Sequence, residues 1–219
     1  MKFAGWQRVS LVDYPGKISS VLFTSGCNMD CIYCHNSDLK KRIHETITEG
    51  LIIKYIKEKR KVLDALVITG GEPSLHKKNL IKFIKKIKEK FPDFLIKIDT
   101  NGSSEEFIRE IIPLVDFIAA DFKGLYYKLF SDFDTELILK NLSLLKSAKK
   151  YEIRITLYPG YIKENEFIMI AEKLKGHNKV VIQQYRKNKE SDFEPYKREM
   201  LSKFFCILKD YVKYVDIRE

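Results

Sequence analysis

Three cysteines, Cys27, Cys31 and Cys34, stand within eight residues of the chain. Thiolates this close in sequence can surround one metal centre, and thiolate-rich sites favour zinc or iron–sulfur clusters. A fourth protein ligand would distinguish the two. His35 is the nearest candidate, but it directly follows Cys34, and adjacent side chains in a loop point apart. Three ligands on a four-iron cluster would instead leave one iron open to a small molecule.

The fourth cysteine, Cys206, stands alone in the apolar stretch 204–208. One isolated cysteine and one tight group make a poor disulfide framework, so we expect Cys206 to be a small buried hydrophobe. His76 and His177 lie at the margins of predicted helices, and we expect structural roles for both.

Short β-branched runs alternate with segments of helical periodicity from residue 18 onward, which is typical of a parallel α/β sheet. Apolar residues at helical spacing are clearest in segments 80–87 and 137–145. The predicted strands are Ile18 to Thr24, Ala65 to Thr69, Phe94 to Asp99, Phe117 to Asp121, Glu152 to Tyr158, Lys179 to Gln184 and Tyr214 to Arg218.

Polar and turn-forming residues follow most of these strands, as in segments 70–73, 99–102 and 121–124. In barrels of alternating strands and helices, the C-terminal strand ends build the active site, so these loops should meet the cysteine loop at one mouth. About six βα units are too few to close an eight-fold barrel. We therefore predict one domain, residues 1–219, forming an open, partial (β/α)6 barrel with segment 1–17 packed on it.

The chain of 219 residues carries a formal net charge of +10, which raises the question of nucleic acid. Its lysines are dispersed along predicted helix faces without the interleaved aromatic residues of a single-strand binder, so solvated helix surfaces are favoured over a nucleic-acid partner. An acidic electron donor would also suit this charge. No apolar run is long enough to cross a bilayer and no signal sequence begins the chain, so we expect no membrane partner and a cytoplasmic location.

The pattern Cys-x3-Cys-x2-Cys, with Tyr33 before the last cysteine, resembles the cluster loop of the radical S-adenosylmethionine (SAM) superfamily. The segment Gly70-Gly71-Glu72-Pro73 is similar to that superfamily's second motif. Together the two motifs favour iron–sulfur over zinc. The resemblance implies a [4Fe-4S] cluster held by the three cysteines, SAM on its open iron, and reductive cleavage of SAM to methionine and a 5′-deoxyadenosyl radical.

The same resemblance assigns roles to further residues. Tyr33 would lie near the adenine, Asn36 near the cluster loop and SAM, and the backbone of Gly70, Gly71 and Glu72 near the methionyl ammonium. Lys123 and Arg154 would pair with the SAM carboxylate, and Asp99, Thr100 and Asp121 would form a monovalent-cation site.

Plainer interpretations of four of these residues remain open. Asp99 and Asp121 could cap helices or pair with lysines, and Lys123 could be a surface lysine. Arg154 could pair with an acidic residue, Glu152 or Glu166, on the outside of the barrel.

Segment 5–16 and the contexts of Cys27 and Cys34 resemble the activating enzymes of glycyl-radical enzymes, and among them the activators of anaerobic ribonucleoside-triphosphate reductase. This implies an anaerobic oxidoreductase that generates a glycyl radical on a partner protein, with electrons from a flavodoxin- or ferredoxin-like donor. Two alternatives stay open. One is a radical SAM enzyme acting on a small molecule or RNA base, in deazapurine or modified-tRNA biosynthesis. The other is a zinc-stabilised binding module without catalytic activity.

Overall fold

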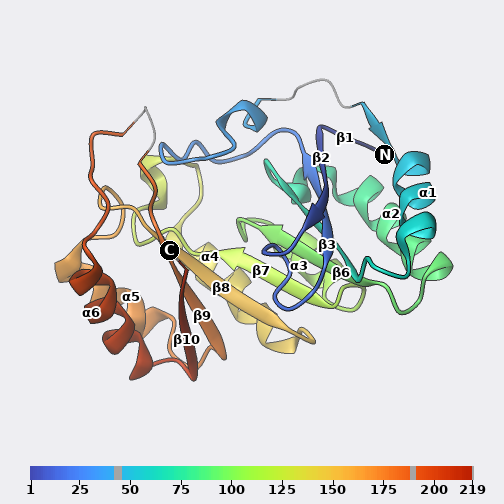
Figure 1. Cartoon of the computed structure of the whole chain (residues 1–219). Helices are drawn as coiled ribbons and strands as arrows, with labels where there is room; N and C mark the ends of the chain where they lie inside the picture. Colours follow the sequence, from blue (N-terminus) through green and yellow to red (C-terminus); the bar gives the residue numbers. More distant parts are fainter. Residues whose placement is uncertain (42–45, 188–190, 219) are drawn as a thin grey trace.

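The computed structural model describes residues 1–41, 46–187 and 191–218, and its centre is an eight-stranded sheet in the order β10-β9-β8-β7-β6-β5-β3-β2 (Figure 1). β1 and β4 pair separately as a small antiparallel ribbon. The strands are β1 Lys2–Phe3, β2 Gly5–Ser10, β3 Ser19–Thr24, β4 Ile47–Thr48, β5 Ala65–Gly70, β6 Leu95–Thr100, β7 Phe117–Asp121, β8 Tyr151–Leu157, β9 Lys179–Gln184 and β10 Tyr214–Arg218.

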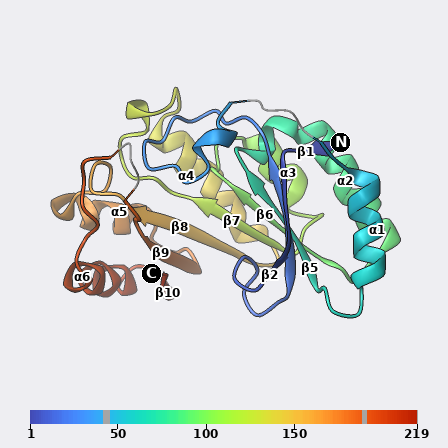
Figure 2. The ribbon, with the colours of Figure 1, turned by 45° about the horizontal axis from the view of Figure 1, so that its top comes forward.

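Helices connect successive parallel strands and lie along one face of the curved sheet (Figure 2). Each presents an apolar stripe to that face. In α2, for example, Leu80, Phe83, Ile84 and Ile87 are buried at helical spacing, whereas most of its lysines are exposed. The helices are α1 Glu49–Lys59, α2 Lys77–Lys90, α3 Glu105–Ile111, α4 Thr135–Leu144, α5 Phe167–Lys173 and α6 Arg198–Lys209.

All seven predicted strands are present, and from β3 to β10 they pair in parallel. β2 and β10 form the two edges of the sheet, so the predicted open, partial barrel is confirmed. β2 was not predicted. It pairs antiparallel with β3 at the edge, and its central residues are exposed, so it lacks the apolar alternation that marks a strand. The assignment of the whole chain to one domain stays a prediction.

Two cores lie on opposite faces of the sheet. The larger one fills the space between strands and helices. The smaller one, on the inner face, joins Tyr14 to Val21, Val67 and Phe117, with the Tyr14 and Phe117 rings 5.6 Å apart. The N-terminal loop after β2 therefore packs inside the barrel, against the early residues of the strands and opposite to the ends that carry the predicted site.

Cys206 is exposed, so the prediction of a buried cysteine is wrong. The buried positions of α6 are Leu201, Phe204 and Leu208, which share one face, and Cys206 lies two residues from Phe204, on another side of the helix. Within the part of the chain that the structure describes, no helix is both long enough and apolar enough to span a membrane.

Candidate active site

One cavity of about 280 Å³ opens among the C-terminal ends of the parallel strands. Inner-face positions on neighbouring strands supply its charged wall, because alternate residues of a strand point to the same side. Asp99 comes from β6, Asp121 from β7 and Arg154 from β8. Every residue predicted for the site lines this cavity, namely Cys27, Cys31, Tyr33, Cys34, Asn36, Gly70, Gly71, Glu72, Asp99, Asp121, Lys123 and Arg154.

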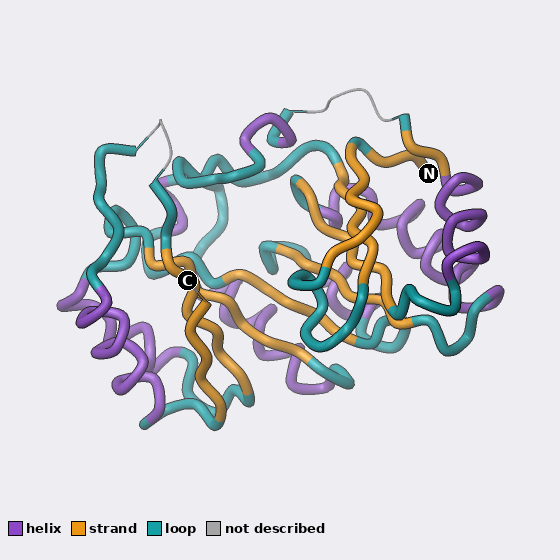
Figure 3. Tube along the Cα trace, viewed as in Figure 1, coloured by secondary structure: helices purple, strands orange, loops and turns teal. Residues whose placement is uncertain are grey.

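The cluster loop, residues 25–36, runs from the end of β3 along the upper edge of the molecule (Figure 3). Backbone contacts fix it at several points. The Cys27 N–H donates to the Lys40 carbonyl at 3.0 Å, and the Asp30 N–H donates to the Phe130 carbonyl at 2.7 Å. The loop is thus anchored to a segment that follows β7, far away in the sequence, and the three cysteines face the cavity from a braced backbone.

The three cysteines carry free thiols, with Cys31 buried and Cys27 and Cys34 half-buried. Burial raises the pKa of Cys27, and it raises the pKa of Cys31 to about 11. Iron binding would therefore displace protons from these thiols. Three thiols on one cavity wall fit a four-iron cluster with an open iron. Among the described residues, no group of three His, Cys, Asp or Glu side chains is placed to hold a single metal ion.

The loop after β5 packs directly against the cluster loop. Gly70 has a φ of +122°, and a Cβ there would stand 2.3 Å from the Thr24 nitrogen. A Cβ on Gly71 would stand 2.0 Å from the Gly26 carbonyl oxygen. Gly70 is therefore required where the end of β5 meets the end of β3, and Gly71 where the loop after β5 meets the cluster loop, which the sequence did not reveal. A methionyl ammonium needs acceptors, so it would use carbonyl groups of this loop.

Glu72 links the ends of β5 and β6 from a position that is 1% exposed. Its carboxylate accepts hydrogen bonds from the Thr100 hydroxyl and the Asn101 N–H, each at 2.7 Å, and from the Ser74 N–H at 3.0 Å. Burial raises the pKa of this carboxyl despite those donors. The side chain of Glu72 therefore holds two strand ends together. Only the backbone of Glu72 remains to contact a ligand.

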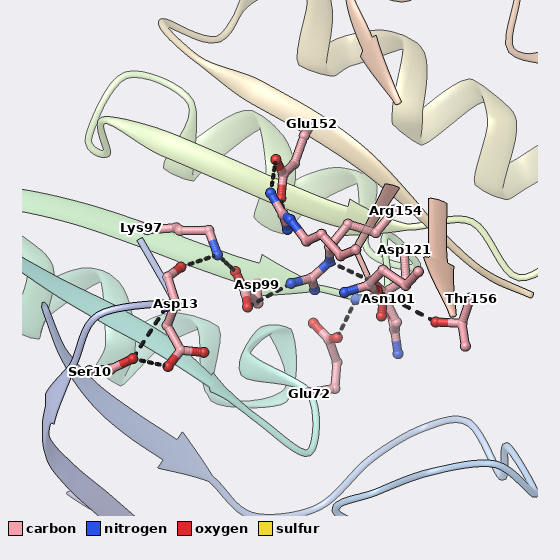
Figure 4. Close-up of polar contacts among 12 residues, drawn as sticks. Ser10, Asp13, Glu72, Lys97, Asp99, Asn101, Asp121, Glu152, Arg154 and Thr156 are labelled. Carbon is pink, nitrogen blue, oxygen red and sulfur yellow. Dashed lines mark hydrogen bonds and ion pairs between the residues drawn. The ribbon is translucent and has the colours of Figure 1, made fainter. Parts of the chain in front are cut away.

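Arg154 lies between two carboxylates at the centre of the cavity wall (Figure 4). It donates to Asp99 and to Asp121, at 2.9 Å in each case, and the Lys123 ammonium pairs with Asp121 at 3.1 Å. Burial alone raises the pKa of Asp121, but Arg154 and Lys123 outweigh it and lower that pKa to about 2. Both aspartates are therefore ionised at neutral pH, since the pKa of Asp99 is lowered as well.

These contacts settle the open interpretations of the charged residues. Lys123 is buried and faces the cavity, so it is not a surface lysine. Arg154 does not pair with Glu152 or Glu166 on the outside of the barrel. Glu152 is fully buried and forms a bidentate ion pair with Arg218. The alternative that both aspartates pair with lysines is confirmed: Asp99 pairs with Lys97, 2.7 Å away, and Asp121 pairs with Lys123.

Tyr33 is buried at the cavity wall and belongs to a cluster of tyrosines. Its ring centroid lies 5.2 Å from that of Tyr158 and 5.5 Å from that of Tyr161, and the Lys123 ammonium lies 5.7 Å from it. The ring is therefore fixed by packing and offers an aromatic surface of the kind that adenine needs. Its role in adenine binding stays a prediction.

Thr100, expected at a cation site, and His35, weighed as a fourth metal ligand, also line the cavity. Several other cavity residues were not assigned a role from the sequence: Met29, Thr69, Asn101, Thr156 and Gln183. A signal was present for two of them. Thr156 stands between Ile155 and Leu157 in β8, and Gln183 follows three apolar residues in β9; the two lie next to each other across the strand pair. Lys97, which supports the wall behind Asp99, carries the same signal, since it stands between Ile96 and Ile98.

Comparison with known proteins identifies the family. The sequence pattern described as "Radical SAM superfamily" matches residues 21–174. This chain belongs to the radical SAM superfamily. It is therefore an enzyme, and members of this superfamily use a [4Fe-4S] cluster and SAM, which suits the three cysteines. The zinc-stabilised, non-catalytic module is excluded by this membership.

Individual relatives indicate which enzymes of the superfamily are similar to this chain. A protein of Methanocaldococcus jannaschii, provisionally named a glycyl-radical enzyme activating enzyme, is 36% identical and covers 96% of this chain and 92% of its own length. The pyruvate formate-lyase-activating enzyme of Staphylococcus aureus is 28% identical over 74% of this chain and 73% of its own. Among solved structures, a radical SAM methyltransferase from Sphaerobacter thermophilus has a TM-score of 0.74 at 15% identity, covering 94% of this chain and 67% of its own, so it shows the shared fold.

Proposed function

We propose that this radical SAM enzyme generates a glycyl radical on a partner enzyme by removing a hydrogen atom from the α-carbon of one glycine. The observation that carries the proposal is the nearly full-length, 36% identical relative that bears the name of such an activating enzyme. The pyruvate formate-lyase-activating enzyme among the further relatives supports the same class of protein substrate.

The residues of the cavity have distinct tasks in this proposal. Cys27, Cys31 and Cys34 hold the [4Fe-4S] cluster, which together with SAM supplies a 5′-deoxyadenosyl radical. Lys123 and Arg154 attract the SAM carboxylate. Asp99 and Asp121 orient the Arg154 guanidinium and the Lys123 ammonium. Asp99 also pairs with the Lys97 ammonium, so three positive side chains face two negative ones. Within this group of five side chains, the excess of one positive charge suits a carboxylate ligand.

The partner that we propose is anaerobic ribonucleoside-triphosphate reductase, and a flavodoxin- or ferredoxin-like protein would deliver the electron. Segment 5–16, which suggested this branch of the family, forms β2 and the loop packed inside the barrel. A glycine reaches the cavity only if the partner exposes the surrounding segment, so the reaction requires local opening of the partner protein.

The experiment that tests the proposal is anaerobic. The cluster-loaded enzyme, SAM and a reductant are mixed with the purified reductase, and the glycyl radical is followed by electron paramagnetic resonance. A radical that appears with the wild-type enzyme, but not with Cys34→Ala or with a reductase whose radical glycine is alanine, would support the proposal.

Two other outcomes point elsewhere. A radical on a different glycyl-radical enzyme, with none on the reductase, would keep the activity and correct the partner. Deoxyadenosine formation without a radical on any such protein would overturn the proposal and favour a small-molecule or RNA substrate.

A further inference from the structure

Lys97 is a buried lysine just behind the charged wall of the cavity. Its side chain is 2% exposed, and it stands on β6 two residues before Asp99, so both point to the inner face. Lysine is almost never fully buried unless it is paired. Its position marks a boundary: Lys97 contacts Phe117 of the inner core on one side and Asp99 of the cavity wall on the other.

The ammonium of Lys97 has three described neighbours. It lies 2.7 Å from Asp99 Oδ1, donates to the Asp13 carbonyl at 2.7 Å, and lies 5.4 Å from the centroid of the Phe117 ring. The contact with Asp99 is an ion pair, and Asp99 Oδ1 has no other described polar partner. A carboxylate oxygen, a carbonyl oxygen and an aromatic face are groups that attract a small cation.

The oxygens of the two cavity aspartates are all taken up by protein cations. Asp99 Oδ1 faces Lys97 and Asp99 Oδ2 faces Arg154, whereas Asp121 Oδ1 faces Arg154 and Asp121 Oδ2 faces Lys123. The Thr100 hydroxyl donates to Glu72. The residues from which a monovalent-cation site was expected therefore do not fit an added ion in this arrangement.

We propose that Lys97 is a positioning residue whose ammonium serves as a tethered cation for the cavity carboxylates, in place of an exchangeable monovalent metal ion. The Lys97 ammonium neutralises one of the two negative charges of Asp99 and Asp121. The positive charges of Arg154 and Lys123 are then only partly neutralised, so they can attract an anionic group of the ligand. Through the Asp13 carbonyl it also fixes the N-terminal loop beneath the site. Ser10 holds the Asp13 side chain, which turns away from Lys97 (Figure 4).

The test compares cation dependence in the cluster-loaded enzyme. Wild type and Lys97→Met are assayed for SAM binding and for deoxyadenosine formation in buffer whose only monovalent cation is tetramethylammonium, which is too large for the site, and again with K⁺ or NH4⁺. The wild type should be indifferent to the cation. Lys97→Met should bind SAM about tenfold or more weakly in tetramethylammonium, because a buried carboxylate has lost its partner, and should recover with K⁺ or NH4⁺.

Thermal unfolding supplies a second readout that does not depend on turnover. K⁺ should raise the midpoint of Lys97→Met in proportion to the logarithm of its concentration once the site fills, and should leave the wild type unmoved beyond a general salt effect. Lys88→Met is the matched control. Lys88 also lies between a carboxylate, Asp116, and a carbonyl, that of Phe94, but outside the cavity, so its loss should not create a K⁺ dependence.

If Lys97→Met fails to fold, the double variant Lys97→Met with Asp99→Asn removes both charges and should fold and unfold without K⁺ dependence. The wild type alone also decides the question. SAM binding by the wild type that requires K⁺ would overturn the proposal, and so would a folded Lys97→Met enzyme that binds SAM normally in tetramethylammonium or stays impaired in K⁺.

Discussion

Gly71 approaches Gly26 so closely that a Cβ on Gly71 would stand 2.0 Å from the carbonyl oxygen of Gly26. The Glu72 N–H donates to that same oxygen at 2.8 Å. The loop after β5 therefore serves as the support on which the cluster loop rests, and disturbance of either loop should reach the cysteines.

Gly71→Ala should impair cluster assembly. The added methyl group meets backbone rather than a flexible side chain, so one loop must shift, at a cost of about 1–3 kcal/mol. We expect less iron per chain after anaerobic reconstitution and a lower unfolding temperature. Gly50→Ala is the control, because a Cβ at Gly50, in α1, meets nothing closer than 4.0 Å, and the change should be neutral or slightly stabilising. Equal iron content in the two variants would contradict the supporting role of this contact.

Alanine at Cys27, Cys31 or Cys34 should abolish both iron binding and SAM cleavage, because each thiolate would be one of only three protein ligands of the cluster. Cys206→Ala should retain both, and its stability should change by less than about 0.5 kcal/mol, since Cys206 is exposed on α6. Iron counting and a deoxyadenosine assay measure the two effects. Loss of iron in Cys206→Ala would refute the ligand assignment.

Arg154→Met should be strongly destabilising. It leaves Asp99 and Asp121 without the guanidinium they share, and loss of one partner from a buried ionic group costs about 3–5 kcal/mol. Urea unfolding measures the cost. The double variant with Asp121→Asn should regain part of it, because one uncompensated charge is then removed. Arg109→Met is the control: its ion pair with Glu105 is exposed, so it should cost less than about 1 kcal/mol. A loss of less than about 1 kcal/mol in Arg154→Met would show that Asp99 and Asp121 do not need the guanidinium to stay buried and charged.

His177 should make the protein less stable in mild acid. Burial lowers its pKa to about 4, and the Tyr151 hydroxyl contacts its Nδ1 atom at 3.3 Å. The unfolded chain binds a proton below about pH 6.5, where the folded chain does not, so stability is full above that pH and falls towards pH 4. Between pH 7.5 and pH 5 the loss should be about 2 kcal/mol. In urea unfolding, the free energy of unfolding of His177→Gln should fall by about 2 kcal/mol less than that of the wild type between pH 7.5 and pH 5. An equal fall in both proteins would assign the acid sensitivity to other groups.

The sequence by itself determined the parallel sheet and the presence of a thiolate-rich loop, whose three cysteines stay the predicted metal ligands. Both are local properties: β-branched runs separated by helical periodicity specify β3 and β5 to β10, and cysteine spacing within one loop specifies a thiolate site. It also indicated which loops would gather, since the C-terminal ends of parallel strands meet at one edge of a barrel. Each of the predicted site residues indeed lines the cavity at that edge.

Only the tertiary structure decided how those residues are paired. Arg154 stands early enough in β8 to suggest an outward role, yet the register of β8 on β7 places it opposite Asp121. Lys97 carries a local signal, a charge between two apolar residues, but that signal does not reveal its partners, and β2 carries no strand pattern, because both environments are built by residues distant in the sequence. Cys206 shows the converse, since its apolar neighbours in the chain lie on other faces of α6. Pairing, burial and charge compensation depend on strand register and helix phase, which are fixed only when the whole sheet has formed.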